Sequence, residues 1–218
     1  AGGKGDRLMP FTQVLPKPLI PINNKTVIEH IIEKFTYFGV RKFFMTVNYK
    51  SLILKSFFKE LQPNYLINFF DETKPLGTIG GLKSHKSKFK ESFFVTNCDI
   101  IIDINYEDLY NFHKENKNDI TLVASTKDFE IPYGICDVTK NGELLKINEK
   151  PKQNFLANTG LYVIKPKTLD LIPNNKFFHM TQLIHQAKKK KMCIGVYPIS
   201  EDKWIDVGQW SEYKKIFN

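Results

Sequence analysis

Short β-rich runs alternate with amphipathic segments of helical period in the first 130 residues, and no other feature restricts the fold as strongly. Apolar side chains recur at helical spacing from Val27 to Phe35, which predicts a helix over Thr26–Phe38 that ends at Gly39. Such a βαβα succession predicts an α/β fold with a mixed, mainly parallel sheet flanked by helices. The same patterns predict helices over Ser51–Leu61, with Leu52, Ile53, Phe57 and Phe58 facing inward, Thr78–His85 and Tyr106–Lys117, and strands over Lys42–Val47, Leu66–Phe70, Ser92–Thr96 and Asp119–Ser125.

The second half of the chain is richer in strands. The run Lys140-Asn141-Gly142 is a hairpin-turn signal between two β-rich segments, Tyr133–Val138 and Leu144–Asn148. Because no repeat, linker or low-complexity tract interrupts the chain, we expect residues 1–218 to form one compact domain. The remaining predicted elements are strands over Leu156–Ile164 and Cys193–Pro198 and helices over Met180–Lys190 and Gln209–Phe217.

Composition argues against several classes of protein. The hydrophobic fraction of 42% supplies a sizeable core, and no apolar run approaches the roughly 20 residues that span a bilayer. Cys98, Cys136 and Cys193 are far apart and odd in number, which argues against a disulfide framework or a zinc site and favours a reducing cytoplasm. The net charge of +9 suits nucleic acid or phosphates. Because the lysines are scattered, we favour a site for phosphate groups. Nucleic-acid binding is the alternative, and tight binding to DNA or RNA that weakens strongly with added salt would reveal it.

The opening segment, Ala1-Gly2-Gly3-Lys4-Gly5-Asp6-Arg7, has the composition of a phosphate-binding loop. Glycines let backbone N–H groups approach phosphate oxygens without a Cβ clash, and an arginine fork can clamp a triphosphate at two points. It is not a Walker loop, because no Gly-Lys-Ser/Thr follows at the required distance. An ordinary glycine-rich turn is the alternative. Since such a loop normally follows a buried strand that aims it, we expect the natural protein to continue upstream by at least one strand.

The residues after this loop point to one family. Leu8, Pro10 and Thr12 follow at fixed distances, and then Pro16-Lys17-Pro18-Leu19. The segment resembles the signature of the sugar-1-phosphate nucleotidylyltransferase family, G-G-x-G-[TS]-R-L-x-P-x-T followed by P-K-P-[LM], from which Asp6 departs. Further family motifs are matched in order at Pro75–Leu82, Val95–Asp99 (with Cys98 in place of the usual glycine), Tyr133-Gly134, Glu149–Pro151, Asn158–Tyr162 and Trp204–Gly208.

The resemblance implies a Rossmann-like fold of the GT-A type, with residues 1–130 as the nucleotide-binding half and 131–218 as a small β-rich, sugar-binding half. It implies an enzyme that condenses a nucleoside triphosphate with a sugar 1-phosphate and releases pyrophosphate. Both reactants are anions, so charge neutralisation and in-line positioning dominate catalysis and no covalent nucleophile is required. The implied partners are these small molecules, without nucleic acid or membrane.

The resemblance also implies roles for single residues. Arg7 would stabilise the leaving pyrophosphate, and Lys17, held stiff and extended between two prolines, would contact the α-phosphate. Asp99 and Asp206 would bind Mg²⁺, which prefers carboxylate and phosphate oxygens. Without the family pattern, Lys17 would be a surface lysine and both aspartates turn residues. The residues expected to bind nucleotide are Gly2, Gly3, Gly5, Glu72, Gly77 and Thr78, and those expected to bind the sugar phosphate are Gly134, Glu149, Lys150 and Asn158.

The base is indicated by Glu72, five residues before Gly77. A carboxylate there would accept hydrogen bonds from N1–H and the amino group of guanine and would suit thymine or uracil poorly, so GTP is favoured; an exposed loop acid is the alternative. The stretch Leu171–Met180 resembles bacterial guanylyl-type members, glucosamine- or mannose-1-phosphate guanylyltransferases, whose domain follows a regulatory cystathionine-β-synthase-like module. A thymidylyl- or uridylyltransferase and a catalytically silent regulatory relative are the alternatives, and the sugar and a homo-oligomeric state stay open.

Overall fold

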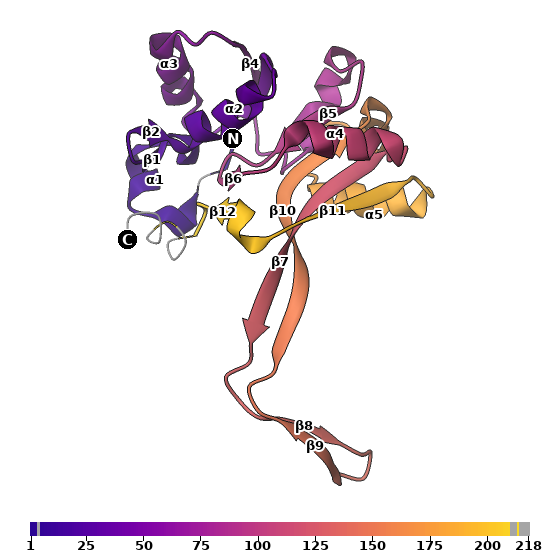
Figure 1. Cartoon of the computed structure of the whole chain (residues 1–218). Coiled ribbons are helices and arrows are strands. Elements are labelled where there is room, and N and C mark those ends of the chain that lie inside the picture. The colour runs from indigo at the N-terminus through magenta and orange to yellow at the C-terminus, as the bar shows by residue number, and fades with distance from the viewer. Residues whose placement is uncertain (4, 210–212, 214–218) are drawn as a thin grey trace.

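The structure is a computed structural model in which residues 1–3, 5–209 and 213 are described. These residues form a body from which one long two-stranded arm projects (Figure 1). Within them, no helix combines the length and the apolar character that crossing a membrane requires. The helices are α1 (Phe11–Val14), α2 (Val27–Tyr37), α3 (Ser51–Leu61), α4 (Tyr106–Glu115) and α5 (Met180–Lys189), with 3₁₀ turns at Asp6–Leu8, Lys17–Leu19, Gly80–Lys88, Pro166–Leu171 and Glu201–Lys203. The strands are β1 (Pro21–Ile22), β2 (Lys25–Thr26), β3 (Lys42–Val47), β4 (Leu66–Asp71), β5 (Phe93–Thr96), β6 (Ile100–Ile102), β7 (Ile120–Glu130), β8 (Ile135–Val138), β9 (Leu144–Asn148), β10 (Lys152–Ile164), β11 (Ile194–Ile199) and β12 (Trp204–Asp206).

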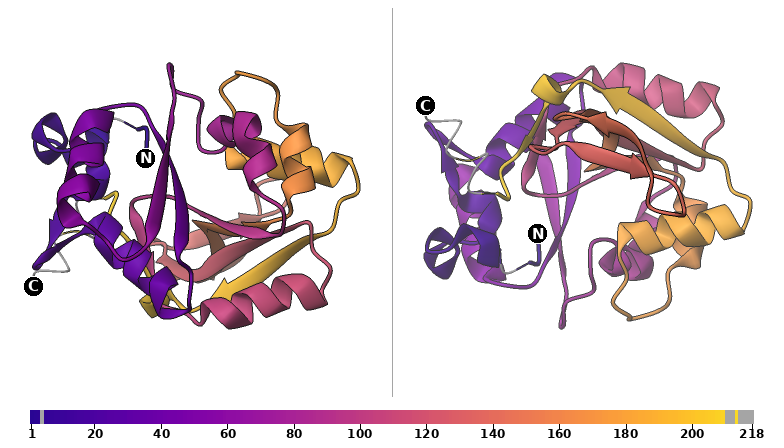
Figure 2. Two further views of the ribbon diagram at one scale, coloured as in Figure 1. Left: turned by 90° about the horizontal axis from the view of Figure 1, so that it is seen from above. Right: turned by 90° about the horizontal axis from the view of Figure 1, so that it is seen from below.

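The largest sheet has four strands in the order β11-β7-β10-β5. β11 is parallel to β7, whereas β10 is antiparallel to both β7 and β5, so β10 alone opposes the common direction. A second parallel pair joins β3 to β4. The helices α4 and α5 lie on opposite sides of the four-stranded sheet (Figure 2). The expected mixed α/β sheet with helices on both faces is therefore confirmed.

Burial on both faces explains the composition of the central strand. Leu161 to Ile164 of β10 are all buried, as a strand covered by helices on each side must be. α2 begins with a capping box, in which the Thr26 side chain accepts from Glu29 N–H and the Glu29 carboxylate accepts from Thr26 N–H at 2.8 Å. Its apolar face then packs into the core at Ile28, Ile31 and Phe35.

Several expected elements differ in the structure. Lys17 is not extended, because it begins the 3₁₀ turn Lys17–Leu19, whose Ile20 N–H donates to the Lys17 carbonyl. Of the four side chains expected to face inward on α3, Phe58 is buried and Phe57 is half-buried. Leu52 and Ile53 are exposed, and Leu54 is buried in their place, since the apolar stripe starts one residue later. The helix expected over 78–85 is a 3₁₀ helix over Gly80–Lys88. The helix expected over Gln209–Phe217 lies mostly outside the described residues.

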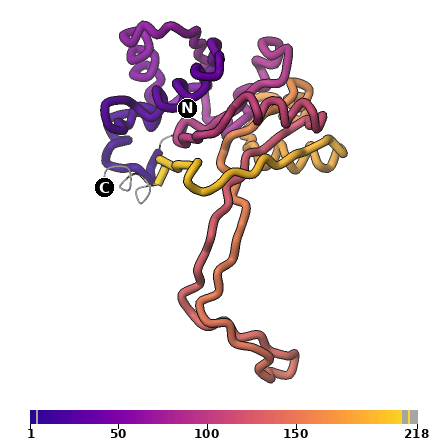
Figure 3. The backbone as a smooth tube through the Cα atoms, viewed as in Figure 1, coloured from indigo at the N-terminus to yellow at the C-terminus, as the bar shows by residue number. Residues whose placement is uncertain are grey.

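The arm is the largest departure from the expected compact domain. β7 and β10 are buried within the body, but beyond Ser125 and before Ala157 they continue as an isolated ladder that pairs Lys152 with Glu130 at its far end. β8 and β9 extend it as a second hairpin, in which every residue of β8 is exposed (Figure 3). Backbone hydrogen bonds between the two strands are satisfied whether or not a body covers them, which lets the strands run past the core.

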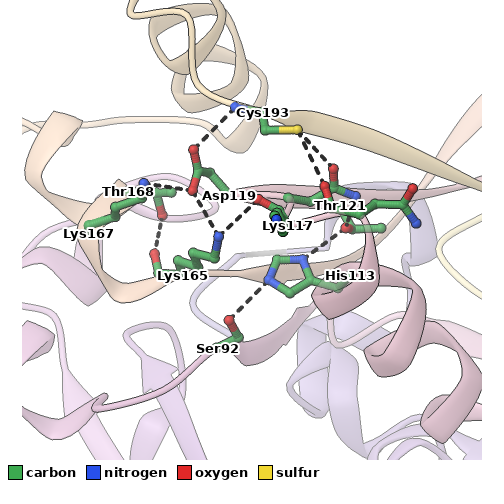
Figure 4. A network of polar contacts seen from close by, with 11 residues as sticks. Ser92, His113, Lys117, Asp119, Thr121, Lys165, Lys167, Thr168 and Cys193 are labelled. Carbon is green, nitrogen blue, oxygen red and sulfur yellow. Dashed lines mark hydrogen bonds and ion pairs between the residues drawn. The ribbon is translucent and has the colours of Figure 1, made fainter.

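A buried polar network holds the outer end of α4 to the sheet (Figure 4). The fully buried ring of His113 makes hydrogen bonds to Thr121 Oγ1 at 2.9 Å and Ser92 Oγ at 3.0 Å. Nearby, the Asp119 Oδ1 atom forms ion pairs with Lys165 Nζ at 3.2 Å and with Lys167 Nζ at 2.8 Å. Burial, and then the charge of Lys165, lower the pKa of His113 from 6.5 to about 4, while Asp119 opposes this shift.

We expect this histidine to make the fold sensitive to acid. The unfolded chain binds a proton at His113 near pH 6.5 and the folded chain only near pH 4, so the unfolding free energy falls as the pH falls between these values. The loss at pH 4 is on the order of 3 kcal/mol. Urea unfolding at several pH values measures how the unfolding free energy changes with pH. Over this window, the slope should be shallower for His113→Gln than for the wild-type chain. His185→Gln, on an exposed position of α5, should keep the wild-type slope; equal slopes for all three chains would contradict the assignment.

Candidate functional site

Three charged side chains from distant parts of the chain meet at one point. Asp99 follows the end of β5, Asp206 ends β12, which pairs antiparallel with β6, and Lys17 begins a 3₁₀ turn near the N-terminus. Lys17 Nζ donates a short hydrogen bond to Asp99 Oδ2, and the two side chains are only 12% and 16% exposed. A Cβ added at Gly208 would lie 2.7 Å from Lys17 Nζ and 2.8 Å from both Asp99 Oδ2 and Asp206 Oδ1. The absence of a side chain at Gly208 therefore leaves the space in which the three charged groups meet.

The composition of this charge cluster, Lys17–Asp99–Asp206, suits a divalent cation bound together with phosphates. One ammonium faces two carboxylates, which leaves a net negative charge. Mg²⁺ commonly takes one or two carboxylates and completes its shell with substrate phosphates and water. Within the described residues, no group of three or more His, Cys, Asp or Glu side chains is arranged to hold a metal by itself. Asp99 and Asp206 thus fit Mg²⁺ as a partner of a bound nucleotide.

The glycine loop lies beside the charge cluster. Gly5 has a left-handed φ of 73°, and a Cβ there would lie 2.8 Å from Thr12 Cγ2 and 3.3 Å from Lys17 Cβ, so only glycine lets the loop pass this close. The Thr12 hydroxyl donates to the Gly5 carbonyl at 3.0 Å and holds this conformation. Gly2, Gly3 and Arg7 line the same cavity as Lys17. Lys4 lies outside the described residues.

This cavity has a volume of about 1210 Å³, with one polar and one apolar end. The glycine loop, Arg7, Lys17 and the segment Asn97–Asp99 line the polar end. β3 and β5, with Phe35 of α2, line the apolar end; among the described strands, β3 pairs only with β4 and β5 only with β10. The cavity is large enough for a nucleotide.

Glu72 forms part of the cavity wall and is not a free loop acid. Its Oε2 accepts the Leu76 N–H at 3.2 Å, and its backbone carbonyl accepts Asn48 Nδ2 at 2.6 Å. A Cβ at Gly81 would lie 2.2 Å from Glu72 Oε1, so this glycine makes room for the carboxylate. Burial raises the pKa of Glu72 above its ordinary value, while the Leu76 hydrogen bond counters the shift.

The loop at Gly77 and Thr78 also lines the cavity. It packs in addition against the segment before α5. Gly77 has a φ of 81°, and a Cβ there would lie 2.5 Å from the Phe178 carbonyl oxygen. The Thr78 hydroxyl accepts the Met180 N–H at 2.8 Å at the start of α5. The structure thus ties this loop to the segment before α5, which the sequence did not indicate.

A second, smaller cavity of about 210 Å³ lies on the other side of Asp99. Arg7, Asp99, Asn158 and Asp206 line it, so Arg7 and Asp99 face both cavities. The Asn158 amide donates to the Tyr162 hydroxyl at 2.7 Å. Of the four residues expected at a sugar phosphate, Asn158 is the one that the structure brings to this place.

The other three, Gly134, Glu149 and Lys150, lie together on the arm. A Cβ at Gly134 would lie 2.9 Å from Glu149 Oε2, and Lys150 follows at a left-handed φ of 43°. Lys152 is already six residues along β10 from Asn158, or about 20 Å at the rise of a strand. These three residues are thus neighbours on the arm, and none of them lines either of the two cavities.

Four residues of the site were missed as contributors. Asn97 lines both cavities and abuts Gly160, whose φ is 95°. Trp204 lines the smaller cavity, and its indole N–H is buried without a hydrogen-bond partner among the described residues. Asn48 and Thr12 brace the loops, as described above. Asn97, Trp204 and Thr12 lie inside motifs that the sequence shows, whereas Asn48 does not, and the contacts of all four depend on tertiary structure.

Comparison with known proteins gives consistent results. The sequence model of a family described as nucleotidyl transferase matches residues 1–218. The mannose-1-phosphate guanyltransferase of Yarrowia lipolytica is 34% identical over 97% of this chain and 60% of its own length, and that of Saccharomyces cerevisiae is 33% identical over 97% and 61%. This chain therefore spans about three fifths of the length of these relatives. The crystal structure of HddC from Yersinia pseudotuberculosis complexed with GMP-PN superposes with a TM-score of 0.75 at 24% identity, covering 99% of this chain and 95% of the other, which confirms the Rossmann-like α/β fold.

Replacing Lys17 tests the charge cluster. Lys17→Met leaves Asp99 and Asp206 facing each other without a cation, so the unfolding free energy at pH 7 should fall by about 2 kcal/mol. Added Mg²⁺ should restore part of it, because a cation replaces the lost ammonium. The control Lys25→Met removes the exposed Lys25–Glu33 pair and should change stability by less than about 0.5 kcal/mol with no Mg²⁺ response. Chemical denaturation measures both, and a Lys17→Met chain as stable as the control would argue against the cluster.

Proposed function

Because this chain belongs to the nucleotidyl transferase family, we propose that it transfers the nucleotidyl group of GTP to a sugar 1-phosphate and releases pyrophosphate. The observation that carries the proposal is the meeting of Lys17, Asp99 and Asp206 beside the glycine loop, where two cavities share Arg7 and Asp99. The larger cavity would hold the nucleotide and the smaller one the sugar phosphate. The α-phosphorus would then lie near the charge cluster.

In this reaction an anionic oxygen of the sugar phosphate attacks the α-phosphorus of the nucleotide. The new P–O bond forms while the bond to the pyrophosphate oxygen breaks, and the electron pair leaves with pyrophosphate. The nucleophile is already deprotonated at neutral pH, so no general base is needed. Catalysis consists of aligning two anions and neutralising their charge.

The chain's own groups supply that neutralisation. The Lys17 ammonium would contact the α-phosphate, and the Arg7 fork would bind the departing pyrophosphate. Backbone N–H groups of Gly2 and Gly3 would hold the remaining phosphate oxygens. Asp99 and Asp206 would hold Mg²⁺, which supplies further charge neutralisation when bound. Burial raises the pKa of the neighbouring Cys98 thiol, which keeps it neutral and adds no negative charge to the cluster.

GTP is the favoured nucleotide for two reasons. The curated relatives at 33–34% identity are guanyltransferases for mannose 1-phosphate. In addition, the Glu72 carboxylate lines the nucleotide cavity and is held by the Leu76 N–H. An acceptor fixed there would match the adjacent donors of guanine.

The three cysteines form no disulfide in the structure, which suits a cytoplasmic enzyme with small-molecule substrates.

Pyrophosphate release tests the reaction. Each of GTP, ATP, UTP and dTTP is combined with a panel of sugar 1-phosphates, and we expect release only with Mg²⁺ and both substrates present, fastest with GTP. Asp99→Asn should lower the rate at least about 100-fold, because it weakens the binding of the Mg²⁺ that would neutralise charge at the reacting phosphate. Asp103→Asn removes a carboxylate from the exposed Lys34–Asp103 pair and should leave the rate within about twofold. No release over the whole panel, with GTP still bound, would favour the catalytically silent relative.

Replacing Glu72 tests the base preference. Glu72→Gln keeps an acceptor for the Leu76 N–H but cannot accept both donors of guanine, so kcat/KM for GTP should fall about tenfold. The same substitution should leave kcat/KM for UTP nearly unchanged, so the ratio of kcat/KM for GTP to that for UTP should fall. Glu33→Gln, in the exposed Lys25–Glu33 pair on α2, is the control. An unchanged ratio of GTP to UTP turnover would show that Glu72 serves only to hold the loop.

A further inference from the structure

Two exposed aromatic side chains line the larger cavity just before α5. Phe177 is 56% exposed, His179 is also exposed, and both belong to the cavity wall. Their rings meet edge to face, with centroids 4.7 Å apart and an interplanar angle of 84°. Phe178 between them is only 6% exposed and packs into the core. Burial therefore alternates along this segment, which leaves the two flanking rings on the side away from the core.

Hydrogen bonds fix the backbone of this segment to the loop that contains Gly77. The Phe178 N–H donates to the Leu76 carbonyl at 2.9 Å, and the Ile79 N–H donates to the Phe178 carbonyl at 3.2 Å. Leu76 in turn donates its own N–H to the Glu72 carboxylate at 3.2 Å. Leu76 thus joins the backbone at Phe178 to the acceptor that we assign to the base. The aromatic segment and that carboxylate are held in one frame.

An exposed aromatic ring in this frame suits one part of a nucleotide. The edge of a base carries its hydrogen-bonding groups, and a carboxylate can read them. The face of a base carries none, and aromatic side chains bind it by stacking. The Phe177 ring has no hydrogen-bonding group, so it can contribute contact with a face and nothing to the reading of an edge. The described residues that line the smaller cavity include neither Phe177 nor His179, which separates the pair from the place given to the sugar phosphate.

We propose that the Phe177 ring packs against the face of the nucleotide base in the larger cavity, while Glu72 contacts the edge of that base. The inference rests on the proposed function, because that function places a nucleotide there. Contact with the face does not depend on the exocyclic amino group of guanine. Phe177 therefore supplies affinity for a purine, and Glu72 supplies the selection of guanine among purines.

This division of roles separates binding from turnover. The base stays unchanged while the bond at the α-phosphorus is exchanged, so contact with the base stabilises the bound substrate and the transition state equally. Loss of the Phe177 ring should therefore raise KM for GTP about tenfold and leave kcat within about twofold.

Isothermal titration calorimetry with GTP and ITP tests the contact without turnover, since ITP has a purine ring but lacks the amino group of guanine. With Mg²⁺ and no sugar phosphate, Phe177→Ala should raise Kd about tenfold for both nucleotides and leave their ratio unchanged. Phe177→Trp keeps a ring and should bind both within about twofold of the wild-type chain. Glu72→Gln should instead weaken GTP more than ITP, because ITP offers the carboxylate one donor fewer.

Tyr37→Ala is the matched control. Tyr37 is 85% exposed on α2, is in edge-to-face contact with Phe38 and does not line either cavity, so both Kd values should stay within about twofold. Urea unfolding should give the same midpoint for Phe177→Ala as for this control, since both side chains are exposed.

The outcomes separate the inference from the proposed function. If the wild-type chain binds GTP and Phe177→Ala binds it equally well, the inference is wrong and the proposed function stands. A loss confined to GTP, or a fall in kcat with unchanged Kd, would also contradict contact with the face of the base. A wild-type chain that binds no nucleoside triphosphate would refute the proposed function, and the inference with it.

Discussion

The hydrogen-bonded pair of Lys17 and Asp99, with Asp206 beside it, is the contact on which the rest of the site depends. It joins the turn after the glycine loop, the end of β5 and the end of β12, and so links both ends of the chain to its centre. Gly208 and Gly5 leave the space that these side chains need. The two carboxylates outnumber the one ammonium, so the folded chain carries at this point a negative charge that attracts a cation. In the proposed function, the triphosphate and the cation would bind together there, because each neutralises the other.

Much of the body was predictable from local pattern. The bounds of β3 and α3 agree with the predicted segments, and α2 differs by one residue at each end, because periodicity, caps and glycines act over short distances. Errors occurred where packing decides. Leu52 and Ile53 face solvent because the apolar stripe of α3 could be placed one residue either way. Lys17 turns into a 3₁₀ helix because the carbonyls of Pro16 and Lys17 find donors at Leu19 and Ile20.

The site was predictable to a different degree in its two parts. Motif spacing indicated Arg7, Lys17, Asp99, Asp206 and Asn158, and the structure brings them to adjoining cavities. The same spacing indicated Gly134, Glu149 and Lys150, but spacing along the chain says nothing about the direction in which a hairpin leaves the sheet. The bracing roles of Asn48, Thr12 and Thr78 were also invisible, since each is a hydrogen bond to backbone that only tertiary structure brings near. Asn48, Thr12 and Thr78 hold loops in place. The family signature indicated candidate substrate-binding residues more readily than the residues that hold those loops.

The charge of the chain is distributed unevenly between the arm and the body. Residues 127–157 carry five lysines and five acidic residues, so the body carries the whole net charge of +9. The arm is neutral and exposes apolar side chains. Its backbone is satisfied by the ladder from Lys127 to Glu130 against Lys152 to Phe155, so exposure costs apolar hydration and no hydrogen bonds.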